Sequence, residues 1–124
     1  MGLNIYPGKT RFAFWGFVEF RKALGRFIKI DIGDFKGFGG QREWKEVKDP
    51  LKYLINHSDV EGSIGPSRLV KILPRLKAAL KLWQKESDAD LKVYYEHVII
   101  PETENLIEGM EEAIKTNKRL TFHG

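Results

Sequence analysis

The sequence contains no cysteine, which excludes disulfide bonds and thiolate–zinc sites. Histidine is scarce, and His57, His97 and His123 are far apart and lack the spacing of metal ligands. The enzyme motifs H-E-x-x-H, G-x-S-x-G and the P-loop are also missing. We therefore expect no bound metal and no cofactor, and we favour a binding protein over an enzyme.

Long apolar runs are absent as well. No stretch approaches the ~18 residues that a membrane-spanning helix needs, so we expect no membrane association. The residues after Met1 lack a basic region followed by an apolar stretch, which favours a cytoplasmic location over secretion. The chain has 124 residues, of which 42% are hydrophobic, and this suits a single domain over residues 1–124.

Charge and glycine are unevenly distributed. Residues 1–83 hold sixteen Lys/Arg and eight Asp/Glu, a net of +8, whereas residues 84–124 hold five and nine, a net of −4. This asymmetry fits two solvated faces that partly neutralise each other, or a basic surface that is free for an anionic partner. It also favours a homo-oligomer, most simply a two-fold dimer. Ten of the twelve glycines lie in residues 1–65, so we expect a loop-rich first half and a helical second half.

Apolar residues recur at helical spacing in three long segments. These segments are residues 11–27, 68–85 and 91–114. Ser67 is the expected N-cap of the second helix. Pro74 is expected to kink that helix or delay its start, and Pro101 to interrupt the third. A shorter helix is expected over residues 50–57, with Pro50 in its first turn.

Short segments with alternating apolar residues predict strands. They are residues 3–6, 28–32 and 120–122. The first and last strands are expected to pair, which would tie the two termini together. The sequence therefore predicts an α+β protein that is mainly α, with three to five helices and a small sheet from the terminal and central short strands.

The polar face of the first predicted helix carries candidates for a binding site. Arg11, Trp15, Lys22 and Arg26 fall within one quadrant, opposite the apolar side. Burial of three cations is costly unless each is paired, so we expect this quadrant to be exposed. An aromatic ring among cations can stack on a nucleobase while the cations bind phosphate. For Trp15, a contact within an oligomer is the alternative.

The loop from Gly37 to Arg42 is a second candidate. Backbone N–H groups in glycine turns can face phosphate oxygens, and Arg42 can donate two hydrogen bonds to one anion. The glycine spacing does not match the dinucleotide-binding motif, so a flexible connection or a tight turn is the alternative. Trp44 follows in a short polar segment that can form a helical turn.

Residues 56–64 concentrate polar side chains that bend the local backbone. We expect Ser58 and Asp59 to hydrogen-bond backbone groups of this turn, with Gly62 as a further structural residue. His57 can instead face a ligand and donate to an anion. The spacing resembles the middle of a calcium-binding loop, but the carboxylates required at the two ends are missing.

The Asn-His-Ser-Asp-x-x-Gly motif at residues 56–62, together with the start Met1 to Asn4 and the pair Phe20-Arg21, resembles a group of small uncharacterised bacterial and phage proteins. The resemblance spans most of the chain and supplies no catalytic residues. No activity is established for that group. If the protein is phage-encoded, we expect it in the host cytoplasm, where it could sequester a nucleotide signal used in immunity.

The leading hypothesis is a non-enzymatic binding protein for an anionic, base-containing small molecule such as a nucleotide or a cyclic-nucleotide-like signal. The candidate ligand-binding residues are Arg11, Trp15, Arg21, Arg26, Arg42, Trp44, His57 and Ser58, with Asp59 and Gly62 as structural turn residues. One alternative is a nucleic-acid-binding module, although a dense Lys/Arg run is lacking. The other is a protein–protein adaptor or inhibitor that uses an aromatic helix face.

Overall fold

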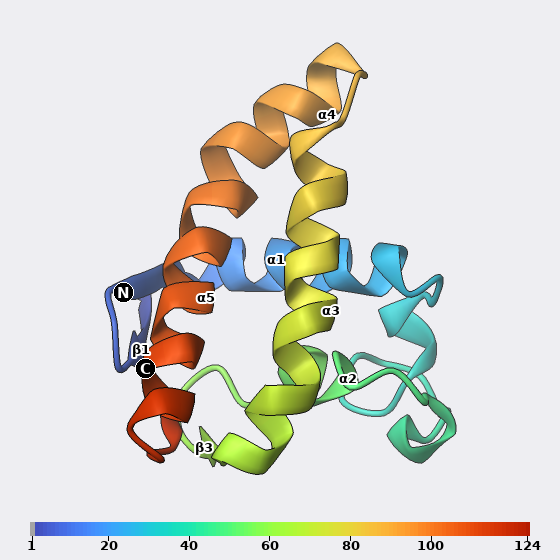
Figure 1. The fold of residues 1–124 in the computed structure, drawn as a ribbon. Coiled ribbons are helices and arrows are strands. Elements are labelled where there is room, and N and C mark those ends of the chain that lie inside the picture. Colours follow the sequence, from blue (N-terminus) through green and yellow to red (C-terminus); the bar gives the residue numbers. More distant parts are fainter. Residues whose placement is uncertain (1) are drawn as a thin grey trace.

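The computed structural model describes residues 2–124, which form a mainly α structure with a small antiparallel sheet (Figure 1). The strands of these residues are β1 (Gly2–Tyr6), β2 (Thr10–Ala13), β3 (Ser63–Ile64) and β4 (Leu120–His123), in the sheet order β2–β1–β4–β3. Ile5 of β1 pairs with Phe122 of β4, so the predicted pairing of the two ends is confirmed. The predicted fold class, α+β and mainly α, is also confirmed.

The remaining elements are helices and short helical turns. They are α1 (Phe14–Phe27), α2 (Lys52–Ile55), α3 (Pro66–Gln84), α4 (Ala89–Tyr94) and α5 (Ile100–Lys115), with 3₁₀ turns η1 (Ile32–Asp34) and η2 (Trp44–Glu46). A π-helical turn, η3 (Tyr95–Ile99), carries the chain from α4 into α5. Figure 1 shows α3 and α5 side by side in front of α1, with α4 at the far end of the pair.

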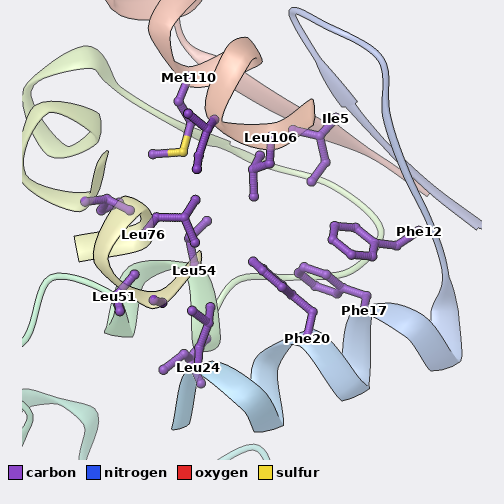
Figure 2. Close-up of a cluster of buried hydrophobic side chains, with 14 of the residues drawn as sticks. Ile5, Phe12, Phe17, Phe20, Leu24, Leu51, Leu54, Leu76, Leu106 and Met110 are labelled. Carbon is purple, nitrogen blue, oxygen red and sulfur yellow. The ribbon is translucent and has the colours of Figure 1, made fainter. Parts of the chain in front are cut away.

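A cluster of buried side chains joins the sheet to the helices. Phe12 of β2 packs on Phe17 and Phe20 of α1, with ring centroids 5.5 and 5.0 Å apart. Figure 2 shows side chains from β1, α2, α3 and α5 converging on the same cluster, among them Ile5, Leu54, Leu76, Leu106 and Met110. This shared core fixes α1 across the α3–α5 pair.

The turn between β1 and β2 touches the backbone of α5 at Gly109. A Cβ atom at this position would lie 2.3 Å from the carbonyl oxygen of Pro7, so no larger residue fits without a shift. Gly8, the next residue of the turn, has φ +102°, and a Cβ atom there would lie 3.0 Å from the Cα atom of Gly109. The missing side chains thus let the sheet sit directly on α5.

The first predicted helix, residues 11–27, begins later than its apolar spacing indicated. Residues Thr10–Ala13 pair with β1 as a strand, and α1 begins only at Phe14. Thr10 and Phe12 are buried while Arg11 and Ala13 are exposed, which is the two-residue period of a strand. Arg11 therefore does not lie on the polar face of α1, and the predicted quadrant of four side chains is wrong at this residue.

The predicted strand over residues 28–32 is also wrong. Lys29 has φ 62°, which reverses the chain after α1, and the N–H of Ile30 donates to the carbonyl of Gly25 at 2.9 Å. Ile32 then packs back on α1, where a Cβ at Gly25 would meet its side chain at 2.8 Å. The alternating isoleucines are explained by this return onto the helix and not by strand pairing.

The start of α3 differs from the prediction. Gly65 is the N-cap and Pro66 lies in the first turn, so the predicted Ser67 cap is wrong. Pro74 lies inside the continuous helix, and Pro101 lies in the first turn of α5, directly after η3. The predicted interruption at Pro101 thus takes the form of a π-helical turn rather than a break.

Candidate functional site

A pocket of about 400 Å³ lies between η2, α2, β3 and the start of α3. Its walls carry three cationic side chains, the rings of a tryptophan, a tyrosine and a histidine, and no carboxylate. We name it the basic aromatic pocket. The lining residues are Trp44, Lys45, Lys52, Tyr53, Asn56, His57, Ser63, Ile64 and Arg68.

Trp44 is held in place by the loop that precedes it. Its ring stacks on Phe35 with centroids 4.6 Å apart and meets the ring of Phe38 edge-on at 5.8 Å. The indole Nε1–H donates to the carbonyl of Lys36 at 2.9 Å. One ring face and the polar edge of Trp44 are thereby engaged, so the indole is a fixed wall of the pocket.

The cations of the pocket come from two helices and the turn η2. The Arg68 guanidinium, in the first turn of α3, lies 4.3 Å from the ring centroid of Tyr53, and the Lys52 Nζ atom lies 5.4 Å from the same centroid. Within residues 2–124, no carboxylate pairs at 4.0 Å or less with Lys45, Lys52 or Arg68. These three charges are therefore available to an external anion.

His57 enters the pocket from the end of α2. Its ring stacks on Phe122 of β4, with centroids 3.8 Å apart, and its Nδ1 atom lies 2.9 Å from the carbonyl oxygen of Ser58. Because a carbonyl only accepts, Nδ1 carries the hydrogen in this contact. Gly62, with φ +105°, packs so closely that a Cβ there would lie 3.1 Å from the imidazole.

The turn that follows His57 is stabilised by Ser58. The Ser58 Oγ atom accepts the N–H groups of Val60 at 3.2 Å and Glu61 at 3.3 Å. The expectation that Ser58 hydrogen-bonds the backbone is thus confirmed. Ser58 is exposed but does not line the basic aromatic pocket, and it supports the turn beside it.

Asp59 does not make the backbone hydrogen bonds expected of it. Its carboxylate pairs with Arg21 of α1 at 3.8 Å, a contact across 38 positions of sequence that local pattern could not reveal. Arg21 is only 8% exposed and lies 4.2 Å from the ring centroid of Phe17 and 5.4 Å from that of Phe38. The ion pair between Arg21 and Asp59 thus connects the turn to α1.

Burial lowers the pKa of the Arg21 guanidinium from its ordinary value, and the neighbouring carboxylate of Asp59 opposes this shift. Within residues 2–124, the Nε atom of Arg21 has no hydrogen-bond partner. Arginine remains charged at neutral pH, so this buried cation relies on Asp59 and on two aromatic ring faces.

The glycine loop that contains Arg42 closes as a compact turn. The N–H of Arg42 donates to the carbonyl of Asp34 at 2.9 Å, and the N–H of Lys36 donates to the carbonyl of Arg42 at 3.0 Å. The Arg42 side chain pairs with Glu46 at 3.3 Å and lies 4.8 Å from the ring centroid of Phe35. The tight turn that sequence left as an alternative describes this loop, and Arg42 points outside the basic aromatic pocket.

Trp15, Lys22 and Arg26 share an exposed face of α1, away from the basic aromatic pocket. Lys22 and Arg26 line a separate pocket of about 420 Å³, and Trp15 is 64% exposed. Nearby, the Tyr94 hydroxyl of α4 donates to Glu19 at 2.8 Å, and burial together with this bond raises the pKa of the Tyr94 phenol. Of the predicted ligand-binding residues, only Trp44 and His57 meet in one pocket.

Sequence reasoning missed Lys45, Lys52, Tyr53 and Arg68. Trp44 is adjacent to Lys45, and Lys52 is adjacent to Tyr53, and these two aromatic–cationic pairs are a readable signal in the sequence. Arg68 had no such signal, because its approach to Tyr53 depends on how α3 leaves the sheet.

Within residues 2–124, no group of three or more His, Asp or Glu side chains is placed to bind a metal ion. In the same residues, no helix combines the length and the apolar character needed to cross a membrane.

Comparison with known proteins yields no match: no family model, no curated protein and no solved structure matches this chain.

Proposed function

We propose that this protein binds a small anionic molecule that carries an aromatic base, of the nucleotide or cyclic-nucleotide class, in the basic aromatic pocket. The observation that carries this proposal is the composition of the pocket walls, where unpaired cations and aromatic rings lie together without a carboxylate. Its volume of about 400 Å³ is within the range of small-molecule sites.

Each kind of side chain has a distinct task in this proposal. Arg68 is the main phosphate ligand, because its planar guanidinium can donate two parallel hydrogen bonds, and Lys45 and Lys52 add point charges. The base stacks against an aromatic wall, for which Trp44 is held rigidly by Phe35. Asn56 offers an amide that can both donate to and accept from a base edge.

We propose that the protein binds this molecule without catalysing a reaction on it. The resemblance of the motif at residues 56–62 to small phage proteins supports capture of a signalling nucleotide. In this proposal His57 and Trp44 keep the ligand-binding role expected from sequence, whereas Arg11, Trp15, Arg21, Arg26 and Arg42 lie outside the pocket.

A titration of three matched double variants tests the proposal. Wild type, Lys52→Ala/Arg68→Ala, Arg11→Ala/Arg26→Ala and Lys81→Ala/Lys92→Ala are titrated by calorimetry with AMP, GMP, cyclic AMP and cyclic dinucleotides. Each double variant removes the same charge. We expect wild type to bind at least one of these nucleotides, and Lys52→Ala/Arg68→Ala to lose about tenfold in affinity per removed cation.

The other outcomes are equally informative. If Arg11→Ala/Arg26→Ala loses binding and Lys52→Ala/Arg68→Ala keeps it, the site includes Arg11 of β2 or Arg26 of α1 and the pocket assignment is wrong. A labelled single-stranded oligonucleotide is added to the panel. Tight, salt-dependent binding of this oligonucleotide with no binding of mononucleotides would favour the nucleic-acid alternative. No binding of either class would leave the adaptor hypothesis.

A further inference from the structure

Helix α1 presents an exposed stripe that its own chain does not cover. Trp15 is 64% exposed and Val18 is 36% exposed, and Lys22 and Arg26 continue the stripe. Intervals of three, seven and eleven residues return to the same side of a helix. Tryptophan is enriched at protein–protein interfaces, so the exposed indole at the start of this stripe is a candidate contact with a partner.

The second half of the stripe forms one wall of the separate pocket of about 420 Å³, which we name the α1 groove. Its main lining residues are Val18, Lys22, Arg26, Ile30, Ile32 and Phe38. Apolar side chains thus line the groove together with two cations. The carboxylate of Asp31, which also borders the groove, accepts the N–H of Gly33 at 2.9 Å.

An indole fits the chemistry of this groove. Its ring buries a large apolar area, and its face attracts cations such as those of Lys22 and Arg26. Within one chain Trp15 is 64% exposed and does not line this groove, so its indole is free to enter the groove of a second copy.

We propose that two copies of this chain form a two-fold dimer in which α1 packs antiparallel to α1 and each Trp15 fills the α1 groove of the other copy. An axis near Val18 places Trp15 of one copy opposite Lys22 of its partner, and the same contact recurs on the other side, as two-fold symmetry requires. Val18 then meets its own copy at the axis. Glu19, beside the axis, is balanced within its chain by Lys22 at 3.8 Å.

The dimer contact and the basic aromatic pocket have no residue in common. An interface built around two indoles lies at the small end of specific protein interfaces, so the dimer should form at micromolar concentrations and above. The proposal therefore stands or falls independently of the proposed ligand.

Light scattering coupled to gel filtration at high micromolar concentration tests this assignment. Wild type should have about twice the monomer mass of 14.3 kDa, and Trp15→Ala should have the monomer mass. Val18→Lys, which places two ammonium groups at the axis, should also be a monomer. Val70→Ala, which truncates an exposed apolar residue of α3 that does not line the groove, should remain a dimer.

Circular dichroism of each variant establishes that it is folded. A wild-type monomer would overturn the proposal, whatever else the groove binds. A folded Trp15→Ala that keeps the dimer mass would overturn it as well. In the supporting result, the emission of wild-type protein shifts to longer wavelength on dilution, as Trp15 becomes exposed, and Trp15→Ala shows no such shift.

Discussion

The pair formed by α3 and α5 and the loop layer, residues 28–62, are held together by different interactions. The two helices bury apolar side chains at intervals of three or four residues. Among them are Leu69, Ile72 and Leu76 of α3 and Leu106 and Met110 of α5. The loop layer contains only short helical turns. Its buried side chains, Leu51, Leu54 and Ile55, join the shared core. Individual contacts at its surface hold the rest, such as the stack of Phe35 on Trp44 and the ion pair of Asp49 with Arg75 at 2.7 Å.

We expect this difference to separate the residues that govern the free energy of unfolding from those of the proposed ligand site. Repeated apolar burial makes the helical pair tolerant of surface change and sensitive to core change. The loop layer supplies most of the side chains of the basic aromatic pocket, because it leaves cations and rings unburied at its surface. The following predictions test whether the two regions respond differently to single substitutions.

The largest effect is expected in the helical pair. Leu106→Ala should lower the free energy of unfolding by about 2–5 kcal/mol, because the side chain is fully buried in the shared core. Leu82→Ala removes the same atoms from a leucine of α3 that is 56% exposed. This variant should change the free energy of unfolding by less than about 0.5 kcal/mol. Denaturant unfolding of both variants measures the difference, and equal values would contradict the assigned core.

A smaller loss is expected where the loop layer is fastened to α3. Asp49 accepts the Nε–H of Arg75 at 2.9 Å and the backbone N–H of Leu51 at 3.0 Å, so Asp49→Ala should cost about 2 kcal/mol. Asp34→Ala, an exposed carboxylate of the same layer, is the control and should be close to neutral. If the two variants have the same unfolding midpoint, the Asp49 contact does not hold the layer.

Asp59→Ala should cost about 1 kcal/mol, because it removes the carboxylate that faces the buried guanidinium of Arg21. Glu61→Ala changes the charge equally in the same turn and should melt like the wild-type protein. Thermal unfolding of both variants by circular dichroism gives the comparison. An unchanged melting temperature for Asp59→Ala would show that Arg21 is held by its aromatic neighbours alone.

The smallest effect concerns the contact between α4 and α1. Burial and the hydrogen bond to Glu19 raise the pKa of Tyr94 above its ordinary value of 10.0. The folded state therefore keeps a proton that the unfolded state loses, so this contribution is present below about pH 10 and declines as the pH rises beyond it. Wild type should lose more stability than Tyr94→Phe between pH 9 and pH 11. Parallel losses would contradict the contact.

The same contrast explains what could be predicted from the sequence. The three long helices, the short helix near residue 52 and the pairing of the terminal strands follow from apolar periodicity and turn residues, which act locally. Ala13 continues the apolar spacing of α1, which predicts a helix from residue 11, and only pairing with β1 makes residues 11–13 part of a strand.

The pocket was only partly predictable for the same reason. Trp44 and His57 were recognised by residue type, but their approach to Arg68 depends on contacts distant in sequence, as does the pairing of Asp59 with Arg21. Arg11 was assigned to the binding face through the helix boundary error. Charges in the sequence thus lead to the hypothesis of an anionic ligand, whereas the fold decides which of these charges lie together.

The most direct measurement of the central claim uses the indole N–H resonances of the protein, which contains three tryptophans. Uniformly ¹⁵N-labelled protein is titrated with AMP and with cyclic AMP. We predict that the Trp44 indole and the amides of residues 44–57 and 63–68 shift, while the indoles of Trp15 and of buried Trp83 stay unchanged. Shifts that centre on Trp15, Lys22 and Arg26, or spectra that do not change at all, would contradict the assignment of the basic aromatic pocket as the ligand site.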